Sequence, residues 1–380
     1  ELNALVEQAQ VEQAWGRVAV VGATADADLL GKLEARKTAP PAQRALFVTE
    51  CAGADAVAQL AGVVAAAPAG GITIVSANVY YGRCVATTEG REEAVDPAKT
   101  MAAIGALIAG GADIVCMQEV VGPLAPKGLG KDDYGGFSQQ FPQASFAPWP
   151  EELEKFGAQE GVKLVYAPAK GSTMYRHSFG NALVINTATL QVDELSLTVQ
   201  DCLTEPTDQE GFEGRAAVTA VVEPVGGGAK LAVCCTHLTE KLIGEQGQKQ
   251  CEMIEALLTG TLADPRYADL PTVLCGDFNI NDVGAMPPES AAYCNSSPFL
   301  HPHTEYDPYK RLASAGFTSS QHYAQQEGTA LNTCWNAGIV DYNGSRGAVR
   351  PLAVGILDPT HDGHVIADHR WPVAVYTSSL

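Results

Sequence analysis

Asp277 and Asn279 have the types and the spacing of a catalytic pair. They end the segment Thr272-Val-Leu-Cys-Gly-Asp-Phe-Asn-Ile280, in which four apolar or β-branched residues precede Gly276. Alternate side chains of a strand point to the same side, so both reach the C-terminal edge where α/β sheets keep their active sites. There an acid can orient a nucleophile or phosphate while an amide donates a hydrogen bond. Because Gly, Asp and Asn are ordinary turn residues, a strand that simply ends in a turn is the alternative.

Polar residues suited to metal and phosphate chemistry recur where other predicted strands end. One such case would be noise, but several separate strands argue for a shared site. The residues are Asn78, Glu119, His237, Asp277 with Asn279, and Asp368 with His369. Glu119 and Asp368 are hard oxygen ligands, which favour Mg²⁺ or Mn²⁺ over zinc. A hard cation held by carboxylates neutralises phosphate charge, so the pattern predicts a metal-dependent phosphoester hydrolase.

Two histidines are candidates for the proton transfers. His369 is a candidate general base for an attacking water, and Asp341 is placed to orient its imidazole and stabilise its charged form. His237 is a candidate donor to the transition-state oxygens. Each histidine has the alternative of an ordinary surface or core residue, and the segment Val340-Asp-Tyr-Asn-Gly344 is also typical of a turn. The segment His361-Asp-Gly-His364 is a rival metal pair.

The overall charge restricts the substrate. The 380 residues include 44 acidic and 24 basic side chains, which gives a net charge of -20. This charge repels a polyanion, so extended nucleic acid is disfavoured unless a local basic cleft overrides it. No apolar run reaches the roughly 18 residues that a membrane-spanning helix needs. A hydrophobic content of 46% over 380 residues is enough for a full core in one or two domains.

The cysteines and the first residue bear on the compartment. None of the ten cysteines has Cys-x-x-Cys spacing, so a structural zinc site is not expected. We expect buried thiols at five positions: Cys116, Cys234, Cys235, Cys251 and Cys275. Disulfides are possible at five others: Cys51, Cys84, Cys202, Cys294 and Cys334. The chain starts with Glu rather than Met, which suggests a processed start. We therefore favour a secreted or organellar location over the cytoplasm and leave the oligomeric state open.

The elements that position these residues follow from hydrophobic periodicity and turn residues. Strands are expected at 72–78, 112–118, 163–168, 181–186, 216–223, 231–237, 272–276, 349–357 and 371–376, with a hairpin turn at 224–228. Helices are expected at 97–109 and 246–258. Residues 122–160 are rich in Gly, Pro and aromatic residues and are interpreted as a long surface loop. Residues 281–330 are interpreted as loops and short helices.

Residues 1–70 are Ala-rich and contain no catalytic cluster. Helices are expected at 3–15, 26–36 and 52–66, and strands at 17–21 and 45–49. The segment Pro68-Ala-Gly-Gly71 is a break between this region and the rest. We therefore divide the chain into an N-terminal α/β extension of unknown role, residues 1–70, and a catalytic domain, residues 71–380.

An ordered set of motifs resembles the endonuclease/exonuclease/phosphatase superfamily. The set is Ser76-Ala-Asn78, Gln118-Glu119, Gly180-Asn181-Ala182, Glu213-Gly-Arg215, Thr236-His237-Leu238, Gly276-Asp277-Phe278-Asn279, Asp341-Tyr342 and Asp368-His369. Each motif is weak alone, but their order and spacing are specific and cover residues 72–377. The resemblance implies the DNase I-like fold, a four-layer α/β sandwich of two packed, mostly antiparallel sheets flanked by helices.

The resemblance also implies a role for each motif residue. A Mg²⁺ ion, with Mn²⁺ or Ca²⁺ as alternatives, would be held mainly by Glu119, with Asp368 helping and Asn78 in the metal or phosphate shell. Water would attack the phosphoester in line. The implied catalytic residues are Asp277, which orients the water, Asn279, which contacts the phosphate, His369 with Asp341 as the base pair, and His237, which stabilises the phosphorane. Arg215 matches a family arginine near the phosphate, with a simple ion pair as the alternative.

Three segments bear on the substrate. Thr236-His-Leu238, residues 305–317 and Asn332-Thr-Cys-Trp335 look more like the sphingomyelinase and related phosphodiesterase branch than like the nucleases. Acidity favours the same branch, because nucleases need a basic groove. We therefore expect a Mg²⁺-dependent phosphodiesterase that acts on a small or lipid-like substrate. The alternatives are a secreted or organellar nuclease of the same superfamily and a catalytically silent binding module.

Overall fold

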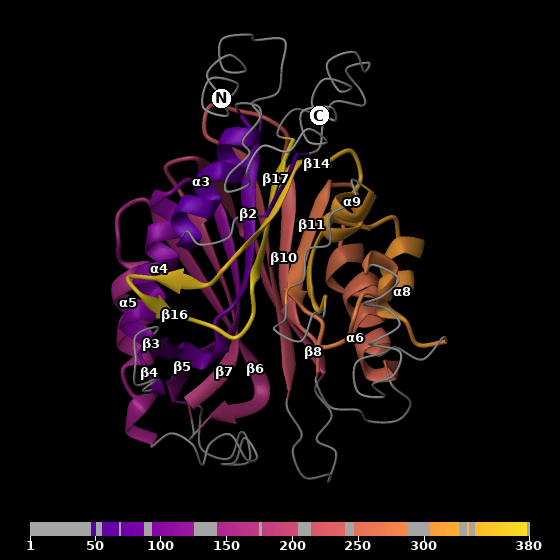
Figure 1. Ribbon diagram of the computed structural model, residues 1–380. Helices are drawn as coiled ribbons and strands as arrows, with labels where there is room; N and C mark the ends of the chain where they lie inside the picture. Colours follow the sequence, from indigo (N-terminus) through magenta and orange to yellow (C-terminus); the bar gives the residue numbers. More distant parts are fainter. Residues whose placement is uncertain are drawn as a thin grey trace.

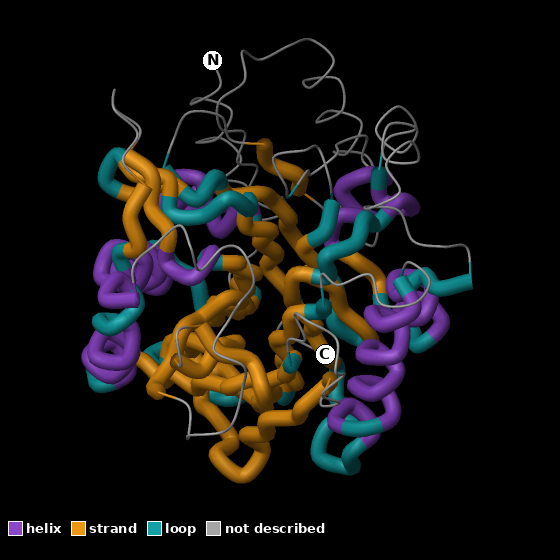
Figure 2. The backbone as a smooth tube through the Cα atoms, turned by 90° about the horizontal axis from the view of Figure 1, so that it is seen from below, coloured by secondary structure: helices purple, strands orange, loops and turns teal. Residues whose placement is uncertain are grey.

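Two β-sheets pack face to face, and helices cover the outer face of each (Figure 1). The computed structural model describes residues 47–50, 55–67, 70–86, 93–124, 143–174, 177–203, 214–239, 247–286, 305–326, 333 and 339–377. Seen from below, the strands form the middle of the molecule and helices lie on two opposite sides (Figure 2). The four-layer α/β sandwich predicted from the resemblance is confirmed.

The first sheet has seven strands. In spatial order they are β1 (Phe47–Glu50), β14 (Pro351–Leu357), β17 (Trp371–Tyr376), β2 (Ile72–Asn78), β5 (Ile114–Leu124), β7 (His177–Asn186) and β6 (Val162–Met174). Only the pairs β1 with β14 and β2 with β5 are parallel. Its outer face is covered by α3 (Ala56–Ala66), α4 (Pro97–Ala109) and α5 (Trp149–Gly157) (Figure 1).

The second sheet has six strands. In order they are β12 (Thr318–Ser319), β13 (Asp341–Arg346), β11 (Thr272–Asp277), β10 (Leu231–His237), β9 (Arg215–Pro224) and β8 (Leu190–Leu203). Only β10 and β11 pair in parallel. The helices on its side are α6 (Gln248–Thr259), α8 (Pro308–Ser314) and α9 (Ser320–Gln326) (Figure 1). A small third sheet joins β15 (Thr360–His361), β16 (His364–Val365), β3 (Arg83–Ala86) and β4 (Glu93–Val95).

The core is divided between the two faces of each sheet by side-chain alternation. On β2, Ile72 and Ile74 join the cluster between the sheets, whereas Val75 and Ala77 pack under the helices of the first layer. Successive side chains of a strand point to opposite faces, and both faces here are buried. Such strands consist almost entirely of apolar residues, which is why their bounds are readable from sequence. The same alternation holds on β11, where Cys275 faces the first sheet and Leu274 faces α6.

Several sequence expectations need correction. The long loop expected at 122–160 contains α5, whose apolar residues Trp149, Leu153 and Phe156 are buried at helical spacing. Strand β8 was not predicted because a register shift between Asp193 and Thr198 interrupts its alternation. The segment around Asp341 is a strand rather than a turn, since β13 pairs with β11 along its whole length. Cys84 and Cys202, expected near loops, are buried free thiols.

Part of the expected N-terminal extension is joined to the sandwich. β1 pairs with β14, and α3 places Leu60 and Val63 in the core beneath the first sheet. The elements expected before residue 47 lie outside the described residues, so the division at residue 70 stays a prediction. No described helix is both long and apolar enough to cross a membrane.

Gly276 permits the close approach of β10 and β11 beside Asp277. A Cβ atom at this position would lie 2.2 Å from the carbonyl oxygen of Thr236, its partner across the ladder. We expect Gly276→Ala to lower the free energy of unfolding by about 2 kcal/mol, because neither backbone can yield without shifting a buried sheet. Urea unfolding measures the effect. Gly157→Ala is the control, since its added Cβ meets only Leu164 at 3.5 Å; equal stability of the two variants would contradict the prediction.

Candidate active site

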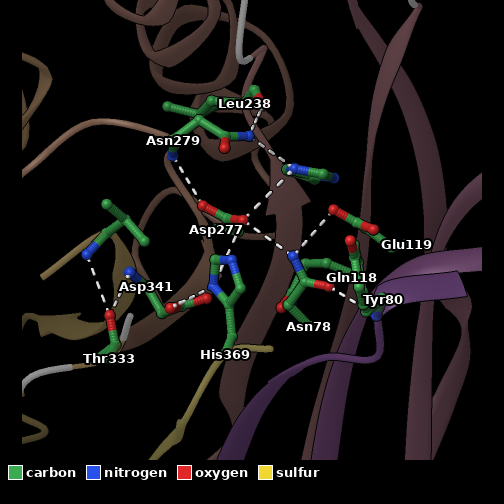
Figure 3. Close-up of polar contacts among 12 residues, drawn as sticks. Asn78, Tyr80, Gln118, Glu119, Leu238, Asp277, Asn279, Thr333, Asp341 and His369 are labelled. Carbon is green, nitrogen blue, oxygen red and sulfur yellow. Dashed lines mark hydrogen bonds and ion pairs between the residues drawn. The ribbon is translucent and has the colours of Figure 1, made fainter. Parts of the chain in front are cut away.

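Strand ends from both sheets meet at one cluster of polar side chains (Figure 3). Asn78 ends β2 of the first sheet, and Asp277 ends β11 of the second. The side-chain nitrogen of Asn78 donates to Glu119 Oε1 at 3.1 Å and to Asp277 Oδ2 at 2.9 Å, which connects the two sheets through one amide. His237, Asp277 and Asp341 are neighbours across the strands β10, β11 and β13.

The orientation of the Asn78 amide is set by its other hydrogen bond. Its Oδ1 accepts from the backbone N–H of Tyr80 at 2.9 Å, so its nitrogen faces the two carboxylates. Tyr80 has φ 46, a left-handed conformation that holds the N–H in this position. In this arrangement Asn78 is a donor that orients Glu119 and Asp277. Its predicted place in the metal or phosphate shell stays a prediction.

Glu119 lies on a β-bulge that directs its side chain into the cluster. The register of β5 against β7 shifts between Met117 and Val120, and Glu119 itself has φ 59. Bulges often redirect a side chain beside an active site, and a non-glycine residue in this conformation costs on the order of 1 kcal/mol. Burial and the nearby carboxylate of Asp368 raise the pKa of Glu119 to about 8. Burial therefore outweighs the opposite effect of the nearby His369 on this carboxyl.

Asp277 and Asn279 form a compact turn at the end of β11, the alternative to the expected arrangement in which one strand carries both residues. The backbone N–H of Asn279 donates to Asp277 Oδ1 at 2.8 Å, and Asn279 has φ 53. The side-chain nitrogen of Asn279 lies 3.0 Å from the carbonyl oxygen of Leu238 and 2.8 Å from His237 Nε2. The amide therefore binds the end of β10 and leaves Asp277 Oδ2 facing the centre of the cluster (Figure 3).

His237 is a buried, neutral imidazole. Its Nε2 is 3.6 Å from Asp277 Oδ2, and its pKa is held well below the ordinary value by burial and by the positive charges of Arg215 and His369. Arg215 begins β9 and is also buried. Its positive charge acts on His237, and its phosphate-binding role stays a prediction.

His369 and Asp341 are in direct contact. His369 Nδ1 lies 2.8 Å from Asp341 Oδ2 and 3.8 Å from Asp277 Oδ2. Burial by itself lowers the pKa of His369, but Asp341 and Asp277 outweigh this effect and raise it well above the ordinary value. Burial raises the pKa of Asp341 to about 6, against the opposite effect of His369. The raised pKa of His369 therefore favours the protonated imidazole beside Asp341.

Thr333 holds the backbone that carries Asp341, and sequence reasoning assigned it no role. Its Oγ1 accepts from the backbone N–H groups of Val340 and Asp341, each at 3.1 Å, and its carbonyl oxygen accepts from the N–H of Arg370 at 2.8 Å (Figure 3). Thr333 thus contacts the chain on both sides of the Asp341 to His369 contact. The only sequence signal was its place in the Asn332-Thr-Cys-Trp335 motif.

The described residues offer a donor set that suits a divalent cation. The ligand atoms of Glu119, His237 and Asp277 lie within 4.8 Å of one another, as do those of Asp277, Asp341 and His369. Asp368 Oδ1 is buried and has no hydrogen-bond partner among the described residues. The pKa of Asp368 is raised by burial, and its charge contributes to the raised pKa of Glu119. A cation between Glu119 and Asp368 would relieve both effects, so these oxygens fit a hard metal ion.

The rival pair, His361 and His364, is occupied by other contacts. The two residues face each other across β15 and β16. His364 Nε2 lies 3.2 Å from the Lys99 ammonium, and His361 Nε2 lies 3.6 Å from Asp362. An ammonium group at this distance opposes the binding of a cation by His364. Hydrogen bonds and close polar contacts join seven of the predicted site residues: Asn78, Glu119, His237, Asp277, Asn279, Asp341 and His369. Their metal and catalytic roles stay predictions.

Removing the charge of Glu119 should stabilise the metal-free protein at alkaline pH. Its carboxyl has a pKa of about 8 in the folded protein against an ordinary value of 4.5. The folded protein therefore keeps a proton that the unfolded chain releases, and the free energy of unfolding falls as the pH rises through this window. With chelator at pH 8, we expect Glu119→Gln to be more stable than the wild type by about 2 kcal/mol. Urea unfolding at pH 5 should show little difference, and equal stability at pH 8 would disprove the prediction.

The sequence matches the profile of the Endonuclease/Exonuclease/phosphatase family over residues 75–315. This range contains Asn78, Glu119, His237 and Asp277 and ends before Asp341 and His369. No curated protein matches the chain.

Solved structures with the same fold have low sequence identity to this chain. An endonuclease/exonuclease/phosphatase from Beutenbergia cavernae is 18% identical, and the match covers 81% of this chain and 72% of that one with a TM-score of 0.52. A functionally unknown conserved protein from Enterococcus faecalis is 15% identical, with coverage of 81% and 100% and a TM-score of 0.50. These similarities support the DNase I-like fold.

Proposed function

The chain belongs to the Endonuclease/Exonuclease/phosphatase family, and from this premise we propose that it is a Mg²⁺-dependent phosphodiesterase acting on a small or lipid-like substrate. Membership supports metal-dependent hydrolysis of a phosphoester in general. The metal identity, the diester and the substrate class are our proposal. The observation that carries it is the convergence of Glu119, Asp277, His237 and His369, contributed by both sheets, around one set of carboxylates.

The cluster contains both acidic and basic side chains. Burial outweighs the nearby positive charges and raises the pKa of Glu119 and of Asp368, and these two carboxyls are the residues that would hold the cation. When bound, a divalent cation neutralises phosphate charge and lowers the pKa of a coordinated water. Arg215 and protonated His369 supply positive charge, and Asp341 balances the charge of His369. A phosphate that contacts both the cation and Arg215 would have cationic groups on two sides, as phosphoryl transfer requires.

The raised pKa of His369 leads us to propose a different role for this residue. His369 was predicted to be the general base, but its raised pKa favours the form that already carries a proton. We therefore assign it to hydrogen bonding with a phosphate oxygen, which Asp341 supports by orienting the ring. Asp277 Oδ2 is the acceptor best placed to orient an attacking water, because Asn78 and Asn279 hold its carboxylate from two directions. Neutral His237 lies beside it as a second contact to the phosphate.

The substrate class rests on charge and on the sequence motifs. A net charge of -20 disfavours an extended polyanion. The Thr236-His-Leu238 form and the segment around Thr333 resemble the sphingomyelinase branch. Thr333, the one described residue of that second motif, contacts the backbone at Asp341.

A substrate panel tests the proposal. Purified protein would be assayed with Mg²⁺, Mn²⁺, Ca²⁺ or chelator on bis-p-nitrophenyl phosphate, p-nitrophenyl phosphate, sphingomyelin vesicles and plasmid DNA, with Glu119→Gln as the blank for contaminating activity. We expect Mg²⁺-dependent cleavage of the diester or the lipid and little cleavage of DNA. Rapid cleavage of DNA with both diesters untouched would support the nuclease alternative, and preference for the monoester would indicate a phosphatase.

A further inference from the structure

Helix α3 is connected by hydrogen bonds to the residue that follows His369. Gln59 on α3 contacts Asp358, and Asp358 contacts Arg370 through the bond from Arg370 Nε to Asp358 Oδ1 at 2.8 Å. We propose that Gln59, Asp358 and Arg370 form a positioning relay that holds His369 against Asp341, so that α3 is part of the catalytic apparatus. The inference rests on the proposed role of His369. None of the three residues lies within the family match at 75–315.

The Asp358 to Arg370 ion pair closes the neck of the loop that carries His369. Leu357 and Trp371 are the last paired residues of β14 and β17, so Asp358 and Arg370 are the next residues on each side. The chain between them forms β15 and β16 and then returns to the active site. An ion pair at the neck fixes where the returning segment leaves the sheet. Both side chains are less than a third exposed, which limits screening by water.

Gln59 fixes the orientation of Asp358 with two hydrogen bonds. Its Nε2 donates to Asp358 Oδ2 at 3.2 Å, and its Oε1 accepts from the backbone N–H of Asp358 at 2.6 Å. Gln59 is fully buried on an otherwise apolar helix face. Burying an amide is costly unless its hydrogen bonds are made, so this residue is a specific contact rather than a filler of the core. With Oδ2 held by Gln59, Asp358 presents Oδ1 to Arg370.

Further hydrogen bonds hold the backbone of Arg370 and the side chain of the next residue, Trp371. Its backbone N–H donates to the carbonyl oxygen of Thr333 at 2.8 Å, and Thr333 Oγ1 binds the backbone of Asp341. The next residue, Trp371, donates from Nε1 to the carbonyl oxygen of Asn78 at 2.9 Å. His369 therefore precedes a residue whose side chain is fixed by α3 and whose backbone is fixed by the loop that holds Asp341. Displacement of a catalytic group by about 1 Å can cost roughly a hundredfold in rate.

Two substitutions that together move the negative charge from Asp358 to position 59 test the relay. Gln59→Glu sets two carboxylates against each other, and Asp358→Asn sets two amide donors against each other. In the double variant each hydrogen-bond donor again faces an acceptor, and the relay keeps one negative charge. We expect each single variant to lower kcat roughly tenfold with KM changed less than about twofold, and the double variant to recover to within about threefold of wild type. A double variant no better than the worse single variant would overturn the relay.

The control separates catalysis from general destabilisation of α3. Val63→Ala removes a buried side chain from the same helix without touching the relay. Its thermal midpoint should fall while kcat, measured where circular dichroism shows every variant folded, stays at the wild-type value. A matching loss of kcat in Val63→Ala would mean that α3 acts only through stability. If His369→Ala is as active as wild type, the proposed function of His369 fails; if it is inactive while Gln59→Glu is unimpaired, only the relay fails.

Discussion

We expect Glu119→Gln to lower kcat for phosphoester hydrolysis by about a thousandfold, equivalent to about 4 kcal/mol of transition-state stabilisation. The substitution keeps the shape of the side chain and the acceptor for Asn78 Nδ2 but removes the charge that a cation needs. The same variant should be stabler than wild type without metal, because burial raises the pKa of Glu119 to about 8 and so disfavours its charged form. Activity and stability therefore change in opposite directions.

Kinetics and metal titration measure this result together. Wild-type protein should gain thermal stability on addition of Mg²⁺, and Glu119→Gln should gain much less. Glu252→Gln, the same chemical change on the exposed surface of α6, is the matched control and should behave as wild type in both assays. Retention of more than about a tenth of wild-type kcat by Glu119→Gln would remove Glu119 from the centre of the mechanism.

The second large effect is expected from the His369 and Asp341 pair. We expect His369→Ala to lower kcat by about a thousandfold and Asp341→Asn by about a hundredfold, with the double variant no slower than His369→Ala. The reason is that Asp341 acts through the imidazole of His369. Once that ring has been removed, replacing Asp341 has no further effect on kcat. Residues that act as a unit show such non-additive effects. Steady-state kinetics of the three variants provides the measurement.

The pH dependence and a control complete this test. Asp341→Asn removes the main charge that raises the pKa of His369, so the alkaline limit of the kcat profile should move to lower pH. His364→Ala addresses the rival metal pair and should leave kcat within about threefold of wild type. Additive losses in the double variant would mean that Asp341 and His369 act separately, and a large loss in His364→Ala would restore the rival pair.

Several strands were readable from sequence because their pairing leaves both faces buried. The bounds 72–78, 231–237 and 371–376 were predicted as observed. A strand covered on both faces is mostly apolar, so the amide Asn78 and the imidazole His237 mark the ends of β2 and β10. These terminal polar residues are also the ones delivered to the sheet edge. This is why Asn78 and His237 could be assigned to a site before the structure was known.

Other features depend on partners that no local pattern specifies. The bulge that gives Glu119 φ 59 arises from its register against β7. Asp341 lies in a strand because it pairs with Asp277 of β11, although Asp-Tyr-Asn-Gly is a turn sequence by itself. Gln59 looked like one polar residue in an Ala-rich helix, and its partner Asp358 is 299 positions away. Local propensity is a weak determinant where tertiary pairing competes with it.

The order of the motifs established the family, the two-sheet architecture and the residue types of the site, because each depends on short apolar runs and the polar groups that end them. The arrangement of those groups was settled by packing. The Asn78 amide faces two carboxylates because the Tyr80 N–H occupies its oxygen, and His369 keeps its proton because Asp341 and Asp277 surround it. Hydrogen-bond direction and proton affinity are set by neighbours within a few ångströms, and folding brings those neighbours together from distant parts of the chain.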